Sequence, residues 1–497
     1  MDRAASLMVA VYEQTWCNAP PPVLDLANPE KRLGFYALLH GSLATLYVAV
    51  SGEASLGFPL DDAYIHQVYA EGIAYGEGLA YNPGTPAAGS TSPMWAIMLA
   101  LFHRLGMSTP ILATKVLGAI LGTLTAFAGD AALRTRDAHA ALAIGCALAI
   151  DPVLVFSSVS GMEVALGCAL GAGAVAAFAH DRVRLCGVLL GLAVVTRPEL
   201  ALVVVALGGW HAHRARESNT DAWRRAAWWL TLPSVATLGG WSLWCLHATN
   251  RALPTTFYAK HVTDLATQWR DVHWAYVVVL GGTFVGLVLV PLVAVAMRRG
   301  WQHRDPLACT LGLLVLAAPL GVAWAHDLAE PDGFYWARYG WVFRPYVWIL
   351  IGTALAGRFW LRAGAIVLIC AAGNVVLVPE YAGNCRNIVE MNVAAADWLR
   401  ERTHESEWIA SNDAGAVRLF GKRRVIDLVG LNDHRVLDGE LESILRETQP
   451  RYYVIFETWF PRLVQSPQFE VAARFRSDPY TICSECTQPE LLILERR

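Results

Sequence analysis

The chain has 497 residues, of which 55% are hydrophobic and only 16% are charged, with a formal net charge of −3. This composition excludes an ordinary soluble enzyme, and apolar runs near the roughly 20 residues that cross a bilayer indicate a polytopic membrane protein. No segment is dense in Lys and Arg, which argues against nucleic acid as a partner.

The chain begins with a polar, Pro-rich stretch over residues 1–33 that lacks a signal-peptide pattern, and we expect it to be a cytoplasmic tail. A transmembrane domain is expected over 34–379. Its apolar runs lie at 34–51, 110–129, 138–156, 162–179, 184–209, 226–247, 273–297, 306–325, 341–356 and 361–379.

Short Arg-bearing links between these runs set the orientation, because the positive-inside rule places such links in the cytoplasm. The links carry Arg134 and Arg136, Arg182 and Arg184, Arg214, Arg216, Arg224 and Arg225, Arg298, Arg299 and Arg304, and Arg358 and Arg362. The intervening polar segments, including a first outer loop over 52–109, are then expected on the extracytoplasmic side of a bacterial inner membrane.

Two runs need a special geometry to keep this orientation. The run 93–106 is too short to span and suits a juxtamembrane or re-entrant helix. The run 184–209 has basic flanks at both ends, so it must cross twice, with a break at 196–199 where Pro198 disfavours a continuous helix. The result is about eleven crossings, with the N-terminus inside and the C-terminus outside.

The first outer loop holds a polar island over residues 58–93 that organises the chain. It opens with the acidic pair Asp61 and Asp62, a pattern that is also typical of a solvated helix cap. The other polar candidates along it are His66 and, as candidates for substrate binding, Tyr69, Asn82 and Thr91.

Further polar residues are expected at the same outer mouth, where ionisable groups at membrane depth are costly and usually functional. They are Glu163, Arg197, Glu199, Tyr258, Lys260, His261, Arg338 and Arg344. Glu163 would equally serve as a helix N-cap, and Arg344 as a side chain that extends toward the interface.

Acidic side chains beside several cations at the outer membrane surface suit one chemistry in particular. Lys or Arg would stabilise a polyprenyl phosphate leaving group, and a carboxylate would take the proton from an attacking sugar hydroxyl. The sequence has no P-loop or Rossmann glycine fingerprint, which argues against a cytosolic nucleotide sugar as donor.

Composition changes near residue 380, and we expect a small α/β domain over 380–497 on the outer face. Its residues 390–403 have an amphipathic helical period, and EWIAS, RRVIDL and RYYVIFE are typical of strands. Cys483 and Cys486 form a CxxC with Cys385 at the start of the segment. A disulfide is plausible there, whereas a zinc site would need a fourth ligand that the sequence does not offer.

Taken together, these residues resemble the GT-C class of integral-membrane glycosyltransferases, and most nearly the group that includes mycobacterial terminal arabinofuranosyltransferases. The matching motifs are DDAYI, GLAYNPG, GSTSPMW, SGMEVAL, GLAVVTRPE, LPTTFYAKH and a late outer Arg-Tyr, followed by DWLRERT, IASNDAG and RRVIDLVGLND. They cover about residues 58–435.

The resemblance implies an inverting enzyme that moves a sugar, with arabinofuranose as the first choice, from a polyprenyl-phosphate donor to a cell-envelope glycan or glycoconjugate. It gives the role of general base to Asp61 and leaves Asp62 to bind acceptor or a divalent cation. Donor-phosphate binding would fall to Lys260, His261, Arg338 and Arg344, with His66 where the family pattern has Arg. The outer domain would hold the glycan acceptor.

Two other classes stay open. A transporter or flippase for lipid-linked sugars would need polar residues on both faces, whereas those here gather on the outer side and the two halves show no repeat. A non-catalytic assembly protein would use the outer domain to bind glycan. A related enzyme that transfers a phosphoryl or amino-sugar group to lipid A would share the same face.

Overall fold

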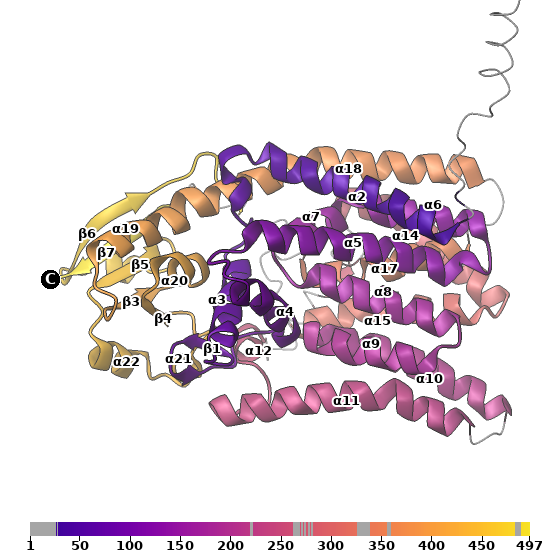
Figure 1. The fold of residues 1–497 in the computed structure, drawn as a ribbon, viewed down its shortest axis with the longest axis horizontal. Helices are drawn as coiled ribbons and strands as arrows, with labels where there is room; N and C mark the ends of the chain where they lie inside the picture. Colours follow the sequence, from indigo (N-terminus) through magenta and orange to yellow (C-terminus); the bar gives the residue numbers. More distant parts are fainter. Residues whose placement is uncertain are drawn as a thin grey trace, which may run out of the picture.

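The computed structural model describes residues 26, 28–218, 222–261, 282–325, 338–354, 359–482 and 489–497, together with residues 269, 272, 275, 276 and 279. It consists of a long helical bundle with a small sheet domain at one end (Figure 1). Cys483 and Cys486, and most of the predicted run 273–297, lie outside the described residues.

The bundle is built from helices that follow the predicted apolar runs. Its helices are α2 Pro29–Val50, α5 Ile111–Arg134, α6 Ala138–Ile150, α7 Pro152–Val159, α8 Val164–Ala179, α9 Val183–Thr196, α10 Ala201–Ser218, α11 Ala222–Thr249, α14 Gly282–Gln302, α15 Pro306–Ala325, α17 Arg344–Thr353 and α18 Phe359–Ile388. The outer loops add η1 Gly52–Leu56, α3 Asp62–Ala74, the hairpin β1 Ala80–Asn82 and β2 Thr85–Pro86, α4 Pro93–Arg104, η2 Pro198–Leu200 and α12 Thr255–Lys260.

Four helices in the described part of the chain are individually long and apolar enough to cross a membrane: Pro29–Val50, Ile111–Arg134, Pro306–Ala325 and Gly364–Arg402. A fifth span results if α6 and α7, which meet at a bend of 49°, count as one. The bend lies at Asp151 and Pro152. The Asp151 carboxylate caps α7 there by accepting hydrogen bonds from the backbone N–H groups of Val153 and Leu154. The count of eleven crossings stays a prediction.

Both special geometries predicted for the short runs have a counterpart in the fold. Residues 93–106 form α4, a 12-residue helix that packs on α3. The run 184–209 is broken as expected, since α9 ends at Thr196 and η2 leads into α10. Arg197, with an extended backbone (φ −145°), makes the turn between the two helices.

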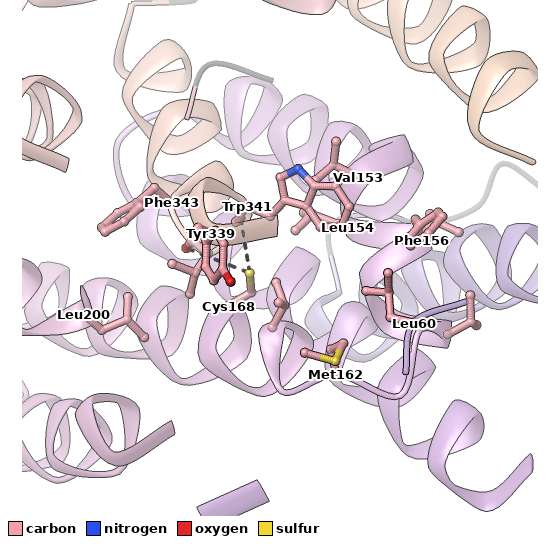
Figure 2. Packing of buried hydrophobic residues seen from close by; sticks show 14 of the residues in the cluster. Leu60, Val153, Leu154, Phe156, Met162, Cys168, Leu200, Tyr339, Trp341 and Phe343 are labelled. Atoms are coloured by element: carbon pink, nitrogen blue, oxygen red, sulfur yellow. Dashed lines mark hydrogen bonds between the residues drawn. The ribbon is translucent and has the colours of Figure 1, made fainter. Parts of the chain in front are cut away.

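Small residues let the helices approach closely near the outer loops. A Cβ on Gly118 of α5 would lie 1.7 Å from the Ser158 carbonyl oxygen of α7, so no larger residue fits there. Leu60, which precedes the acidic pair, belongs to the same buried apolar cluster as Met162 and Trp341 (Figure 2). This packing fixes the start of α3, and therefore the position of the acidic pair, relative to the bundle.

The C-terminal domain contains the three predicted strands, β3 Trp408–Ser411, β4 Arg424–Asp427 and β5 Tyr452–Phe456. The sheet has the order β4-β3-β5-β7-β6, with β3 parallel to both neighbours and β7 antiparallel to β5 and β6. Its other elements are α20 Gly415–Gly421, α21 His434–Leu437, α22 Leu441–Thr448, α23 Pro461–Val464, β6 Phe469–Phe475 and β7 Leu491–Arg496. The last two strands were not predicted.

The boundary predicted between 379 and 380 falls inside a helix. α18 continues through a π-helical turn, η3 Val389–Val393, into α19 Ala394–Arg402, so the predicted amphipathic helix over 390–403 is the end of a membrane helix. The change in composition there reflects a helix that leaves the bilayer, because its surroundings change from lipid to water while the backbone continues.

Candidate active site

A cavity of about 400 Å³ lies where the outer ends of the bundle helices meet the outer loops. Its apolar lining includes Trp241, Phe257 and Trp324. Its charged and polar lining residues are Asp62, Thr91, Glu163, Thr196, Arg197, Glu199, Ser242, Thr256, Lys260, Arg338 and Tyr339. Most of the polar residues that the sequence placed at one mouth therefore do come together.

Asp62 is the centre of one charge cluster in the cavity. Its carboxylate lies 2.5 Å from the Arg338 guanidinium and 3.7 Å from the Lys260 ammonium. Burial would raise the pKa of Asp62, but Lys260 and Arg338 outweigh burial and hold its pKa below the ordinary value. Asp62 is therefore ionised at neutral pH and holds the two cations side by side.

The hydroxyl of Tyr339 completes this cluster, 3.3 Å from both Lys260 Nζ and Arg338 Nη2. Burial would lower the pKa of Lys260, but Tyr339 and Asp62 keep its pKa above the ordinary value, so the ammonium stays charged. The sequence groups Tyr339 with Arg338 but gives it no role. It also gives no signal for the apolar wall, because single aromatic residues in membrane helices have no distinctive pattern.

Glu163 is the centre of a second, more deeply buried cluster. It lies 2.8 Å from the Arg197 guanidinium and 2.9 Å from His66 Nε2, and all three side chains are about 95% buried or more. Glu199 is 3.9 Å from Arg197 on the other side. Glu163 also stands before the first turn of α8 but makes no side-chain cap there, so the ion pairs rather than capping account for its position.

Asp61 has quite different surroundings from its neighbour. Its two carboxylate oxygens accept hydrogen bonds from the backbone N–H groups of Gly415 (2.6 Å) and Ala416 (2.8 Å) in the outer domain. Asp61 is 7% exposed and does not line the cavity. Successive residues at the start of a helix point about 100° apart, so Asp61 faces the outer domain while Asp62 faces the cavity.

Tyr69 and Asn82, predicted to bind substrate, likewise contact the outer domain. The Tyr69 hydroxyl donates to Asn432 (3.1 Å) and accepts from the Gly89 N–H. The Asn82 side chain donates to the Val425 carbonyl (2.8 Å) and accepts from the Val425 N–H (3.0 Å), which extends the edge of β4. Both residues attach the first outer loop to the C-terminal sheet.

Three further candidates, Arg344, His261 and Tyr258, do not line the cavity. Arg344 is 1% exposed and donates to Asp151 at 2.8 Å, in a buried pair that Trp348 Nε1 also joins at 2.7 Å. The ring of His261 stacks on Phe257, and its Nδ1 is 3.0 Å from the Trp324 carbonyl oxygen. Tyr258 packs under the Arg251 guanidinium at 4.8 Å.

A divalent cation beside Asp61 and Asp62 stays a prediction, and the surroundings of the two carboxylates do not fit one. Asp61 is taken up by two backbone N–H groups and Asp62 by two cationic side chains. Within the described ranges, no three His, Cys, Asp or Glu side chains gather in a metal-binding arrangement.

Comparisons with known proteins place the fold. A family model described as a domain of unknown function (DUF8728) matches residues 385–492, which is the outer domain alone. No curated protein matches the chain. Solved structures match over nearly all of it, at sequence identities that show the fold only.

One similar structure is ArnT from Cupriavidus metallidurans bound to undecaprenyl phosphate, with a TM-score of 0.61 and 12% identity over 93% of this chain and 98% of that one. Another is the oligosaccharyltransferase AglB from Archaeoglobus fulgidus with an inhibitory peptide and a dolichol-phosphate, with a TM-score of 0.51 and 12% identity, covering 84% and 70%. An oligosaccharyltransferase from Archaeoglobus fulgidus tethered to an acceptor peptide is also similar, with a TM-score of 0.53 and 12% identity over 88% of this chain and 73% of that one. The chain therefore has the GT-C fold, whereas the narrower arabinofuranosyltransferase group is not confirmed.

Proposed function

We propose that this chain is an extracytoplasmic glycosyltransferase that moves a sugar from a polyprenyl-phosphate donor to a cell-envelope glycan or glycoconjugate. The observation that carries the proposal is the pair of cations, Lys260 and Arg338, held beside Asp62 in a cavity with an apolar wall. The fold adds support, because the similar proteins ArnT and AglB have structures with undecaprenyl phosphate and dolichol-phosphate.

Lys260 and Arg338 are suited to bind the donor phosphate and to stabilise the charge that develops on it as the bond to the sugar breaks. The aromatic wall formed by Trp241, Phe257 and Trp324 would lie against the first isoprene units. An incoming phosphate competes with Asp62 for the two cations. Because those cations keep the pKa of Asp62 low, their movement toward the phosphate makes Asp62 a stronger base.

In the transfer step, an acceptor hydroxyl attacks the anomeric carbon of the sugar from the side opposite the phosphate. Asp62 takes the hydroxyl proton, the bond between the anomeric carbon and the phosphate oxygen breaks, and the lipid phosphate leaves with the electron pair. The configuration at the anomeric carbon is inverted. We assign the base role to Asp62 rather than Asp61, because Asp61 faces the backbone of the outer domain.

The buried cluster of Glu163, Arg197 and His66 would contact the sugar. Among the residues that the structure describes, the buried His66 Nδ1 and Arg197 Nε atoms have no hydrogen-bond partner, and such groups are suited to hydroxyls of a bound ligand. Arabinofuranose as the sugar, and inversion as the outcome, rest on the family resemblance.

The proposal is tested with purified protein in lipid, offered a panel of polyprenyl-phosphate sugars and a mixed glycan acceptor. Transfer from one donor is expected, with a loss of about 10²–10⁴-fold in Asp62→Asn, the usual effect of removing a general base. Lys260→Gln should weaken transfer, whereas Lys422→Gln, a lysine paired with Glu71 outside the cavity, should not.

Three outcomes would reject the proposal. Full activity in Asp62→Asn would exclude the assigned base. Movement of the lipid-linked sugar across the bilayer without transfer would favour a flippase. Glycan binding by the protein with no turnover of any donor would favour an assembly role.

A further inference from the structure

A second cavity, of about 340 Å³, lies between α2 and α5 on the side of the bundle. It is a groove whose walls are Ala37, Gly41, Ala44, Thr45 and Val48 of α2 and Leu112, Lys115, Val116, Ala119, Ile120 and Thr123 of α5, with Val159 at its floor. It shares no lining residue with the candidate active site. Large apolar side chains at its rim, such as Val116 and Ile120, are more than half exposed, so this face contacts lipid.

The walls of this groove are suited to a hydrocarbon chain. The two threonine hydroxyls on them are already bonded within their own helices, Thr45 to the Gly41 carbonyl (2.7 Å) and Thr123 to the Ala119 carbonyl (3.0 Å). From Ala37 to Val48 the groove runs about 16 Å along α2. That is about half of the roughly 30 Å hydrocarbon core, or one leaflet.

Lys115 lies at the outer end of the groove, on the first turns of α5. Its side chain is 2% exposed, and its ammonium donates to the Ser55 carbonyl of η1 at 2.6 Å. The rings of Phe58 and Tyr381 lie 5.9 and 5.5 Å from it. Among the described residues no carboxylate comes within ion-pairing distance of Lys115, and it bonds to no second acceptor.

A buried ammonium has three donors and carries a full charge, and burying it without an anion is costly. Most other buried cations near the outer loops, such as Arg197, Arg338 and Arg344, have a carboxylate partner. Lys115 therefore differs in having a backbone carbonyl, two aromatic rings and the Cys385 thiol as its neighbours. An anion delivered along the groove would supply the missing charge.

We propose that the groove binds one acyl chain of an anionic phospholipid of the outer leaflet, with Lys115 donating to the lipid phosphate. The length of the groove favours a phospholipid over a polyprenyl phosphate, because an acyl chain ends within one leaflet whereas a polyprenyl chain continues beyond it. A lipid bound there would bridge α2, α5 and η1, directly below the loop that begins α3.

Gly41 and Gly34 provide a matched pair of variants on one helix. A Cβ at either position would meet no atom within 4 Å, so neither glycine is required by close packing of the backbone and a leucine is the substitution to compare at both. Gly41 lines the groove and Gly34 does not. Gly41→Leu therefore fills the groove without disturbing the packing, and Gly34→Leu controls for the change in helix propensity and hydrophobicity.

The test measures lipid retained by the purified full-length protein in detergent, by native mass spectrometry after titration with phosphatidylglycerol or phosphatidylcholine. Phosphatidylglycerol is expected to bind the wild type and Gly34→Leu alike, and about tenfold more weakly to Lys115→Gln and Gly41→Leu. Equal binding of the two lipids, or unchanged phosphatidylglycerol binding in Gly41→Leu, would overturn the proposal. So would displacement of phosphatidylglycerol by added polyprenyl phosphate from the wild type but not from Lys260→Gln, because the lipid would then occupy the active-site cavity. If Lys115→Gln does not fold, the glycine pair decides alone.

Discussion

The acidic pair shows how two adjacent, identical side chains acquire separate roles. Asp62 faces Arg338 and Lys260 in the cavity, whereas Asp61 accepts two backbone N–H groups of the outer domain. The residue that ties the loop to the outer domain and the residue that holds the cations are therefore one position apart. A substitution that removes either carboxylate should have a distinct effect.

Asp61→Asn is predicted to destabilise the junction between the first outer loop and the outer domain. The carboxylate gives one oxygen to each N–H group, whereas an amide has one oxygen and would turn its own NH₂ toward the second donor. The free energy of unfolding should fall by about 1–3 kcal/mol, the usual effect of an unsatisfied buried donor.

The measurement is the thermal midpoint of the purified protein, followed together with the rate at which a protease cleaves the first outer loop. Glu53→Gln, which removes an exposed carboxylate from η1 in the same loop, is the control and should change neither quantity. An unchanged midpoint and protease resistance in Asp61→Asn would contradict this role.

A pH effect is expected at the same junction from Asp413. Burial, together with the charges of Asp62 and Asp427, raises its pKa to about 6, although the hydrogen bond that Asn392 donates to its carboxylate (2.7 Å) acts in the opposite direction. At a pH between the ordinary pKa of an aspartate and about 6, Asp413 is protonated in the folded state and ionised in the unfolded state. Stability should therefore fall as pH rises across this range and stay low above it.

The thermal midpoint measured from pH 4.5 to 7.5 should show this decrease, worth on the order of 1–2 kcal/mol. Asp413→Asn should make the decrease smaller, because the amide does not titrate; burial and Asp413 also raise the pKa of Asp61 well above its ordinary value, so Asp61 should contribute to the part that remains. A slope that is the same in the variant would assign the pH dependence to another group.

At the scale of elements, the short helix α20 is what the first outer loop binds. A Cβ on Gly415, at the start of α20, would lie 2.2 Å from the Asp61 carbonyl oxygen and 2.7 Å from its carboxylate. Gly421, at the other end of the same helix, has its nearest atom at 3.7 Å, which is ordinary contact. Only the first glycine is required by the approach of the two elements.

Gly415→Ala is accordingly predicted to separate α20 from Asp61, and Gly421→Ala to be tolerated. Because α3 begins at Asp62, the displaced loop would also move Asp62 relative to Lys260. Sugar transfer should therefore fall at least about tenfold in Gly415→Ala with a lower thermal midpoint. Wild-type activity in this variant would show that the cavity does not depend on the outer domain.

The elements that the sequence predicts well are those with a local cause. The break near Pro198 and the strands β3, β4 and β5 follow from residues within a few positions of each other. The continuity of α18 with α19 was not predicted, since a composition change looks the same whether a helix ends or leaves the membrane. The strands β6 and β7 were missed because β6 is half-exposed and lacks a continuous apolar run.

For the candidate site, topology was enough to gather the charges but not to pair them. Orientation from Arg-bearing links brought Asp62, Glu163, Arg197, Lys260 and Arg338 to one cavity. Which cation meets which acid often depends on partners more than a hundred residues apart, as for Arg338 with Asp62 and Arg344 with Asp151. The sequence therefore could not distinguish this structural pair from the cations that line the cavity.

At the scale of the whole molecule, the cavity residues come from loops and helix ends scattered between residues 62 and 339. The outer domain, at the other end of the chain, holds the first of these loops. This arrangement works at the extracytoplasmic face only if the loops and the outer domain are on the same side. Figure 1 places them at the same end of the bundle, with the Arg-bearing link that follows α14 at the other end.

The last prediction is which end of the bundle faces the cytoplasm, and two exposed tryptophans test it. Trp459 lies in the outer domain and is 61% exposed; Trp301 lies at the end of α14 beside Arg298 and Arg299 and is 75% exposed. Because basic links stay in the cytoplasm, Trp459→Cys should react with a membrane-impermeant maleimide in intact cells, and Trp301→Cys only after permeabilisation. Wild-type cells give the background from the native cysteines. Labelling of Trp301→Cys in intact cells with protection of Trp459→Cys would invert the molecule, and the cavity would then face nucleotide sugars of the cytoplasm instead of lipid-linked donors outside.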